Sequence, residues 1–220
     1  MKRLRVAIDG PAASGKTTTA REVAERLGYR YLDSGALYRA LAVKASREGL
    51  DPDDVEAIEA CLARTDGDYG PDGEVRLDGE ALGPELRSPA VSDLASRLSV
   101  HPPVRAWVND RLRAAATGGE VVMEGRDIGT VVLPDAEVKV FLEARITVRV
   151  DRRHRDLETA GHTEPRDKVA EDLERRDTRD SGRPVAPLMP APDAIVLDGS
   201  DLSFDQQVEK VLALVADRAR

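Results

Sequence analysis

One short string constrains this chain more than any other. Residues Gly10 to Thr17 follow the phosphate-binding loop pattern, in which a glycine and any four residues precede Gly-Lys-Thr or Gly-Lys-Ser. An apolar stretch that ends at Ile8 predicts a buried strand before this loop. The apolar spacing from Thr18 to Leu27 predicts a helix after it, with Gly28 at its end. This context separates the motif from a chance match, so the chain is predicted to be an α/β nucleotide-binding protein.

The residues of the loop have separate physical tasks. Gly10 and Gly15 let the backbone curl around a phosphate without Cβ clashes, so that N–H groups and a helix amino end face the anion. Lys16 can reach the β- and γ-phosphates, and the Thr17 hydroxyl can hold Mg²⁺. The residues expected to bind a nucleoside triphosphate are Gly10, Pro11, Ala12, Ala13, Ser14, Gly15, Lys16, Thr17 and Thr18.

Composition limits the partners and the surroundings of the protein. The 220 residues suffice for one sizeable α/β domain, and the net charge of −8 argues against a general nucleic-acid binder. No stretch reaches the ~20 apolar residues that a membrane span needs. A single cysteine, Cys61, excludes a disulfide within the chain. We therefore expect a cytoplasmic protein with neither a nucleic-acid nor a membrane partner.

Apolar runs alternate with helical patterns almost throughout the chain, which predicts a parallel sheet wrapped by helices. The predicted strands cover residues 4–8, 29–32, 121–123, 138–142 and 194–197. Ligands of such sheets bind beyond the carboxyl ends of the strands. The phosphate-binding loop, the pair Asp33-Ser34 and the stretch 124–127 all follow predicted strands, so we expect them to meet at one edge.

Residues 65–87 have a different character from the rest of the chain. The turn pairs Asp72-Gly73 and Asp78-Gly79 flank a short β-like run over 74–77. This pattern predicts a small β-meander inserted into the α/β domain, and we place the insert at about residues 63–96 of a single domain that covers 1–220.

Three arginines, Arg149, Arg152 and Arg153, share one face of a predicted helix. Taken alone, they could form a solvated basic face. Beside a phosphate-binding loop, they instead suggest positive charge brought to a migrating phosphoryl group.

Arginines also occur where an acceptor would lie. Arg39 and Arg126 each follow a strand end and could grip a phosphate with two hydrogen bonds. Arg176, Asp180 and Arg183 lie on one face if their helix continues to residue 183. Their pattern fits either recognition of a base and a ribose or plain ion pairing along the helix, and spacing alone leaves both open.

Two further strings identify a family. Asp33-Ser34-Gly35-Ala36 and Gly125-Arg126-Asp127-Ile128-Gly129-Thr130 are specific to bacterial cytidylate kinases, which this sequence resembles from Ile8 nearly to the last helix. The string Arg176-Asp177-Thr178-Arg179-Asp180 belongs to the same resemblance.

The resemblance implies a P-loop kinase fold with a short helical lid at about 148–166, and transfer of the ATP γ-phosphoryl group to CMP or dCMP. It places ATP and Mg²⁺ at the loop, with Lys16, Arg126, Arg149, Arg152 and Arg153 as catalytic residues. The implied substrate-binding residues are Ser34, Arg39, Ser96, Arg105, Arg126, Asp127, Arg176, Asp180 and Arg183. Glu124, where the family usually has Asp, is implied to hold Mg²⁺ through water.

Two alternatives stay open at this point. One is another small-molecule P-loop kinase, acting on a different monophosphate or on shikimate. The other is a regulatory NTP-binding switch without small-molecule chemistry, for which the arginines at 39, 105, 126 and 183 would scatter over the surface. We expect a monomer under the cytidylate kinase reading.

Overall fold

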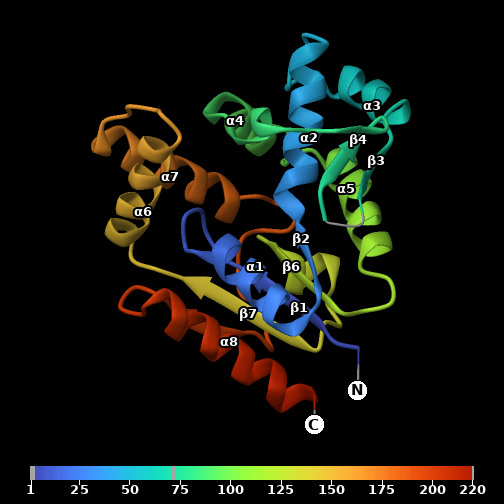
Figure 1. The fold of residues 1–220 in the computed structure, drawn as a ribbon. Helices are drawn as coiled ribbons and strands as arrows, with labels where there is room; N and C mark the ends of the chain where they lie inside the picture. Colours follow the sequence, from blue (N-terminus) through green and yellow to red (C-terminus); the bar gives the residue numbers. More distant parts are fainter. Residues whose placement is uncertain (1–2, 71–72, 220) are drawn as a thin grey trace.

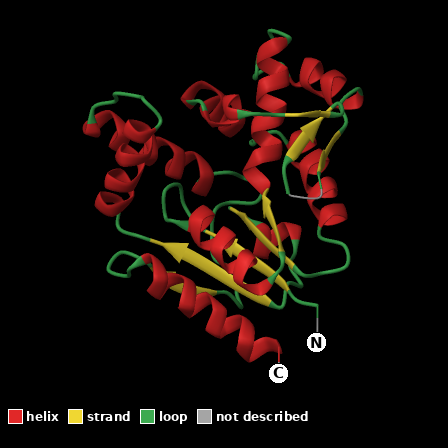
Figure 2. Cartoon of the chain, viewed as in Figure 1, coloured by secondary structure: helices red, strands yellow, loops and turns green. Residues whose placement is uncertain are grey.

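A parallel sheet organises the structure, a computed structural model that describes residues 3–70 and 73–219. Within those residues, five strands pair in the order β2-β6-β1-β7-β8 (Figures 1 and 2). The strands are β1 (Arg5–Asp9), β2 (Arg30–Asp33), β6 (Val121–Gly125), β7 (Val138–Glu143) and β8 (Ile195–Asp198). All pairs are parallel, which confirms the predicted α/β class.

Helices cover both faces of the sheet, because the central strands are apolar on both sides. The helices are α1 (Lys16–Leu27), α2 (Ser34–Arg47), α3 (Val55–Ala63), α4 (Pro89–Leu98), α5 (Pro102–Ala115), α6 (Ile146–Thr159), α7 (Arg166–Ser181) and α8 (Phe204–Ala219). Val6 and Ile8 pack with α1 and α8, whereas Ala7 packs with α2 and α5 on the opposite face.

Local sequence signals fix several helix ends. α1 stops at Gly28, whose φ of 66° lies in the left-handed region that glycine tolerates. Ser203 and Gln206 form a reciprocal cap at α8: the Gln206 N–H donates to the Ser203 hydroxyl at 3.2 Å, and the Ser203 N–H donates to the Gln206 side chain at 3.0 Å. A π-helical turn, η2 (Ile128–Val132), follows β6 and was not apparent from periodicity.

The expected β-meander is present. In the described residues, β3 (Gly67–Tyr69), β4 (Val75–Leu77) and β5 (Glu80–Ala81) pair antiparallel, and a 3₁₀ turn, η1 (Pro84–Arg87), follows them. The turn predicted at Asp72-Gly73 falls partly outside the described residues, since Asp72 is not among them. Figure 1 shows both groups of inserted elements beyond the carboxyl ends of the strands, with α3, β3 and β4 at the upper right and α6 and α7 at the upper left.

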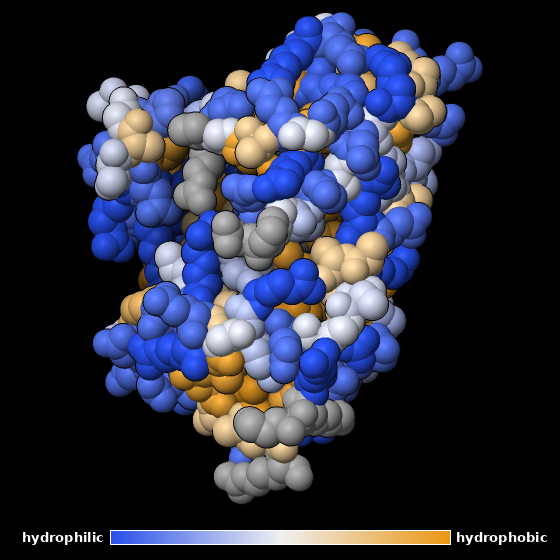
Figure 3. Space-filling model, turned by 45° about the vertical axis from the view of Figure 1, so that its right-hand side comes forward, coloured by the Kyte–Doolittle hydropathy of each residue, from blue (hydrophilic) through white to orange (hydrophobic). Residues whose placement is uncertain are grey.

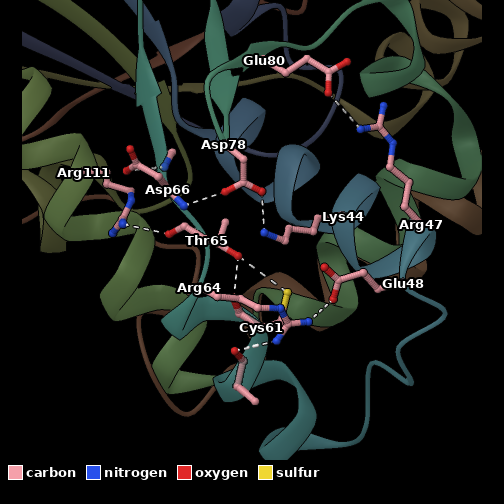
Figure 4. A network of polar contacts seen from close by, with 12 residues as sticks. Lys44, Arg47, Glu48, Cys61, Arg64, Thr65, Asp66, Asp78, Glu80 and Arg111 are labelled. Carbon is pink, nitrogen blue, oxygen red and sulfur yellow. Dashed lines mark hydrogen bonds and ion pairs between the residues drawn. The ribbon is translucent and has the colours of Figure 1, made fainter.

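Polar contacts fasten the meander to α2 (Figure 4). The Lys44 ammonium of α2 donates to Asp78 at 2.5 Å, and the other Asp78 oxygen accepts from the Asp66 N–H at 2.9 Å. The Tyr69 hydroxyl donates to the Asp33 carbonyl at 2.7 Å. These contacts hold the meander against the end of β2, where a phosphate-binding site was predicted.

The face of the molecule in Figure 3 is mostly hydrophilic, which agrees with the 34% of charged residues in the sequence. Hydrophobic residues gather toward the lower end of this face. In the part of the chain that the structure describes, no helix combines the length and the apolar character needed to cross a bilayer.

Lys44→Met tests how the meander is held. The substitution leaves Asp78 without its charged partner, and only 12% of the Lys44 side chain is exposed. We expect the free energy of unfolding to fall by roughly 1 kcal/mol, measured by urea denaturation. Arg47→Met, one turn along on α2, is the control, because its pair with Glu80 spans 3.4 Å between exposed side chains. Equal losses in both variants would contradict an anchoring role for Lys44.

Candidate active site

The loop after β1 has the backbone that a phosphate cradle requires. Gly10 has a φ of 152°, and a Cβ there would lie 2.0 Å from the Leu142 carbonyl oxygen, so no other residue fits. Gly15 precedes α1 with a φ of 96°. Within the described residues no side chain caps the amino end of α1. Its first N–H groups therefore remain available to an anion.

Lys16 lies inside this loop rather than in solvent. Its ammonium donates to the Pro11 carbonyl at 2.9 Å, and the residue is only 6% exposed. Burial and the nearby Arg126 lower the pKa of Lys16 to about 7. A negatively charged ligand would favour the charged form, so the amine is prepared to receive phosphate oxygens.

Neighbouring strand ends bring oxygen atoms beside the loop. The strand register pairs Asp33 of β2 and Ile8 of β1 with Glu124 of β6. Burial, followed by the charge of Asp33, raises the pKa of Glu124, while a hydrogen bond from the Thr17 hydroxyl lowers it. The Tyr31 hydroxyl donates to Glu124 at 2.6 Å. Thr17 and Glu124 thus form an oxygen pair of the kind that Mg²⁺ prefers.

The same edge gathers the predicted acceptor-site residues from the ends of β2 and β6. Arg39 donates to Asp33 at 2.6 Å. Ser34 is buried, and a Cβ on Gly125 would lie 2.5 Å from its hydroxyl oxygen, so the Ser34 side chain lies against the Gly125 backbone at the end of β6. Sequence spacing had placed these residues at the same edge, and the structure brings them together.

Buried ion pairs connect this edge to α5 and α7. Arg126 donates to Asp180 at 3.0 Å, and Arg183 approaches the other oxygen of the same carboxylate at 3.6 Å. Arg105 of α5 donates to Asp127 and, at 3.2 Å, to the Ser99 carbonyl. Asp180 therefore does pair with arginines, but with one that follows β6 and with one that lies just beyond its own helix, because α7 ends at Ser181 and does not continue to residue 183.

Positive charge in the cluster is incompletely compensated. Burial and Arg126 together lower the pKa of Arg176 to about 10. Four guanidinium groups of the cluster also have a buried nitrogen that lacks a hydrogen-bond partner in the described residues, although Arg183 Nη2 still approaches Asp180 at 3.6 Å. These atoms are Arg39 Nε, Arg105 Nε, Arg176 Nε and Arg183 Nη2. Because buried donors are ordinarily satisfied, these atoms mark a site for an acceptor-rich ligand.

The three arginines of α6 have different surroundings. Arg149 is buried, donates to the Ala12 carbonyl at 3.2 Å and pairs with Asp177 at 2.6 Å. Arg152 donates to the Ser14 carbonyl at 2.8 Å and to the Gly199 carbonyl at 2.9 Å. Arg153 lines a cavity of about 70 Å³ between α4 and the α6-α7 pair. In this structure α6 is therefore held against the phosphate-binding loop.

Several site residues were not found from the sequence. Ser96 was expected in the acceptor site, but its partner Arg179, which donates to the Ser96 hydroxyl at 2.8 Å, was not singled out. Asp9 and Tyr31 also escaped notice. Asp9 follows an apolar strand directly, which is a signal that could have found it, whereas nothing local distinguishes Arg179 from the other arginines of α7.

Comparison with known proteins gives a consistent result. The family model described as cytidylate kinase matches residues 6–217. The chain is 44% identical over 220 residues to a cytidylate kinase of Geobacillus kaustophilus, covering 99% of this chain and 98% of that protein. A cytidylate kinase of Thermotoga neapolitana is 42% identical over 217 residues, with 98% of each chain covered. A solved shikimate kinase from Bacteroides thetaiotaomicron, 13% identical, has a TM-score of 0.50 over 97% of this chain and 98% of its own, a likeness of fold alone.

The lowered pKa of Lys16, about 7, predicts proton uptake when a polyphosphate binds. At pH 8 the buried amine is mostly neutral, and an anion returns its pKa toward the usual range. Titration calorimetry with tripolyphosphate in buffers of different ionisation enthalpy should show an uptake of roughly one proton. Lys16→Arg is the control, because a guanidinium stays charged throughout. Equal uptake in the two proteins would mean that Lys16 is already charged before binding.

Proposed function

This chain belongs to the cytidylate kinase family, and from that premise we propose how its residues divide the work of the reaction. The protein is an ATP-dependent phosphotransferase that converts CMP or dCMP to the diphosphate. The observation that carries the proposal is a set of four arginines, each with a buried nitrogen that lacks a hydrogen-bond partner in the part of the chain that the structure describes, namely Arg39, Arg105, Arg176 and Arg183. An acceptor phosphate and its nucleoside would supply the hydrogen-bond acceptors that these groups lack.

The donor side of the site is the phosphate-binding loop. We assign the backbone N–H groups of the loop and the Lys16 ammonium to the β- and γ-phosphates of ATP. Arg149 and Arg152 fix α6 against the carbonyls of Ala12 and Ser14, which leaves the loop's N–H groups directed at the ligand. Lys16 gains its charge as the phosphates arrive, so the positive charge is present when negative charge moves between oxygens.

At the acceptor side of the site, the protein has to orient the CMP phosphate and does not have to remove a proton from it. A phosphate monoester is mostly dianionic at neutral pH, since its second pKa is about 6, and it can attack without a general base. We assign Arg39 and Arg126 to the acceptor phosphate, with Ser34 as a further donor. In the free protein these arginines pair with Asp33 and Asp180, which keeps them folded into the site. In-line alignment of the two phosphates then follows from their fixed attachment points.

The residues present fit a bound Mg²⁺. The Thr17 hydroxyl and the Glu124 carboxylate supply hard oxygen ligands beside the loop, directly or through water. When bound, the ion neutralises charge on the phosphate oxygens. Glu124 carries one more methylene than the Asp usual in this family, and the Tyr31 hydroxyl bond at 2.6 Å restrains that longer side chain.

Base and sugar recognition is assigned to buried and half-buried polar groups of α4, α5 and α7 and of the segments that follow β6 and α7. Cytosine offers an amino donor at C4 and an acceptor at N3, which a carboxylate and an arginine can meet. A site of this kind rejects uracil, because every buried group left unpaired costs about 1–3 kcal/mol. The residues concerned are Ser96, Arg105, Asp127, Arg176, Asp180 and Arg183.

The arginine cluster also bears on the two alternative functions, a nucleotide switch and another small-molecule kinase. A nucleotide switch has no use for a buried arginine cluster opposite its phosphate loop, and those arginines are not scattered over the surface. A shikimate kinase would not need a polar base site, whereas a kinase for another nucleoside monophosphate would need one and is separated from a cytidylate kinase only by its base preference. A coupled assay with ATP and, in turn, CMP, dCMP, UMP and AMP separates the alternatives, and we expect turnover with CMP and dCMP and little with UMP or AMP.

We also propose that the protein works as a monomer in the cytoplasm. All residues assigned to both phosphates come from one chain, and Cys61 is a buried free thiol that suits a reducing compartment. Sedimentation at working concentration tests the first statement.

Arg126→Ala tests the acceptor phosphate site. The substitution removes a charge from the acceptor phosphate and frees Asp180, so we expect kcat/KM for CMP to fall by about 100-fold. The dissociation constant of ATP should stay within about twofold. Arg175→Ala, which removes an exposed arginine of α7 paired with Asp172 at 2.8 Å, is the control. Equal losses for ATP and CMP would assign Arg126 a structural role instead.

Asp180→Ala tests base selection. We expect a higher KM for CMP and a smaller ratio of kcat/KM for CMP to that for UMP. The reason is that the lost carboxylate can accept a hydrogen bond from the amino group of cytosine, which uracil lacks. If Asp180 only orients Arg126 and Arg183, kcat/KM falls by the same factor for CMP and UMP, and the ratio of the two values is unchanged. Steady-state rates for the two substrates decide, with Asp172→Ala as the control on the exposed face of α7.

A further inference from the structure

We propose that Asp9 is a positioning residue, which sets the acceptor loop that carries Arg126 and Asp127 in register with the phosphate-binding loop. The inference rests on the proposed function, because it concerns how the proposed acceptor residues are held. Asp9 itself touches neither nucleotide in this proposal, and it acts through the loop over residues 125–129.

The contacts are made by both oxygens of one buried carboxylate. Asp9 is 5% exposed, and its Oδ1 accepts from the Ile128 N–H at 2.8 Å while Oδ2 accepts from the Gly129 N–H at 2.7 Å. A Cβ on Gly129 would lie 3.4 Å from Oδ2, so the glycine leaves room for this approach. The two N–H groups belong to a segment 119 and 120 residues further along the chain.

These N–H groups are those of a first helical turn that lacks its own cap. Asp127 occupies the N-cap position of η2, where an aspartate usually accepts from the turn that follows it. Its side chain makes no such bond and is held instead by Arg105 of α5. Asp9 therefore performs the capping from a distant strand, and the Asp127 carboxylate pairs with Arg105 instead of capping this turn.

The same residue joins the two halves of the reaction. Asp9 immediately precedes Gly10, and its backbone is paired in register with Gly125, which precedes Arg126. One side chain thus fixes the distance between the loop that holds the donor phosphates and the arginine that holds the acceptor phosphate. Displacements of about 1 Å in such an alignment reduce rates by about 100-fold.

A carboxylate at position 9 does not maximise the stability of the folded protein. Burial raises the pKa of Asp9 to about 6, although the two backbone N–H groups lower it. At neutral pH the protein therefore holds an ionised group that its surroundings disfavour. A neutral side chain would avoid this cost, which agrees with a positioning task that requires two acceptor atoms.

Asp9→Asn is the direct test, because the amide keeps the shape but can accept only one of the two N–H groups. At pH 8 we expect kcat/KM for CMP to fall at least tenfold and the ATP dissociation constant, from calorimetry, to change less than twofold. Asp193→Asn is the matched control and should leave both values within twofold. Asp193 pairs at 2.8 Å with Lys139, whose stem lies against Gly129, but it contacts neither nucleotide loop. Equal losses for ATP and CMP in Asp9→Asn would overturn the proposal.

A double-mutant cycle separates positioning from general loosening. If Asp9 acts through Arg126, then Asp9→Asn should reduce kcat/KM at least fivefold less in the Arg126→Ala background than in the wild type. Additive losses would overturn the proposal. An Arg126→Ala variant with unchanged kcat/KM for CMP would instead remove the proposed function.

A measurement on the wild-type protein covers the case in which Asp9→Asn does not fold. Backbone amide exchange followed by NMR should show Ile128 and Gly129 protected to within about tenfold of Ala7 in the centre of β1. Exchange as fast as in an exposed loop would overturn the proposal. The exchange result does not depend on which nucleotide the enzyme phosphorylates.

Discussion

The structure depends first on the parallel register of three neighbouring strands. β6 pairs with β2 on one side and with β1 on the other, so Glu124 lies between Asp33 and Ile8. The groups assigned to phosphate or metal binding lie at or after the carboxyl ends of these strands: Lys16 and Thr17 after β1, Ser34 and Arg39 after β2, and Glu124 and Arg126 at the end of β6. A shift of one residue in either pairing would turn each strand's side chains to the opposite face and separate the loop from the acceptor arginines.

Burial of charge is the second constraint. The free protein keeps guanidinium groups of Arg105, Arg176 and Arg183 in a region where not every donor has a partner, and it keeps Lys16 with a pKa near 7. Such groups make the unliganded state less stable than a neutral core would be. Binding of anionic nucleotides supplies the missing acceptors, so part of the binding free energy comes from relief of this imbalance.

The sequence was sufficient for the sheet, the phosphate-binding loop and the meander, because hydrophobic periodicity and turn residues are local signals. It also placed Arg39 and Arg126 at one edge, since the carboxyl ends of parallel strands coincide. The cap from Asp9 and the bond from Arg179 to Ser96 join segments far apart in sequence, and no spacing rule encodes them. The contacts of Arg152 with backbone carbonyls were missed for a related reason. Every residue has a backbone carbonyl, so the sequence does not mark which one accepts a hydrogen bond.

The contacts of Arg152 and Gln207 have a consequence for how the protein is made. Arg152 joins the Ser14 carbonyl to that of Gly199, and the Gln207 amide donates to the Thr19 hydroxyl, so the first loop is supported by late segments of the chain. While a ribosome is still translating residues beyond 199, the nascent chain already contains the whole phosphate-binding motif without these supports. We therefore expect the nascent chain to acquire nucleotide binding late in synthesis, after the earlier strands of the sheet have paired.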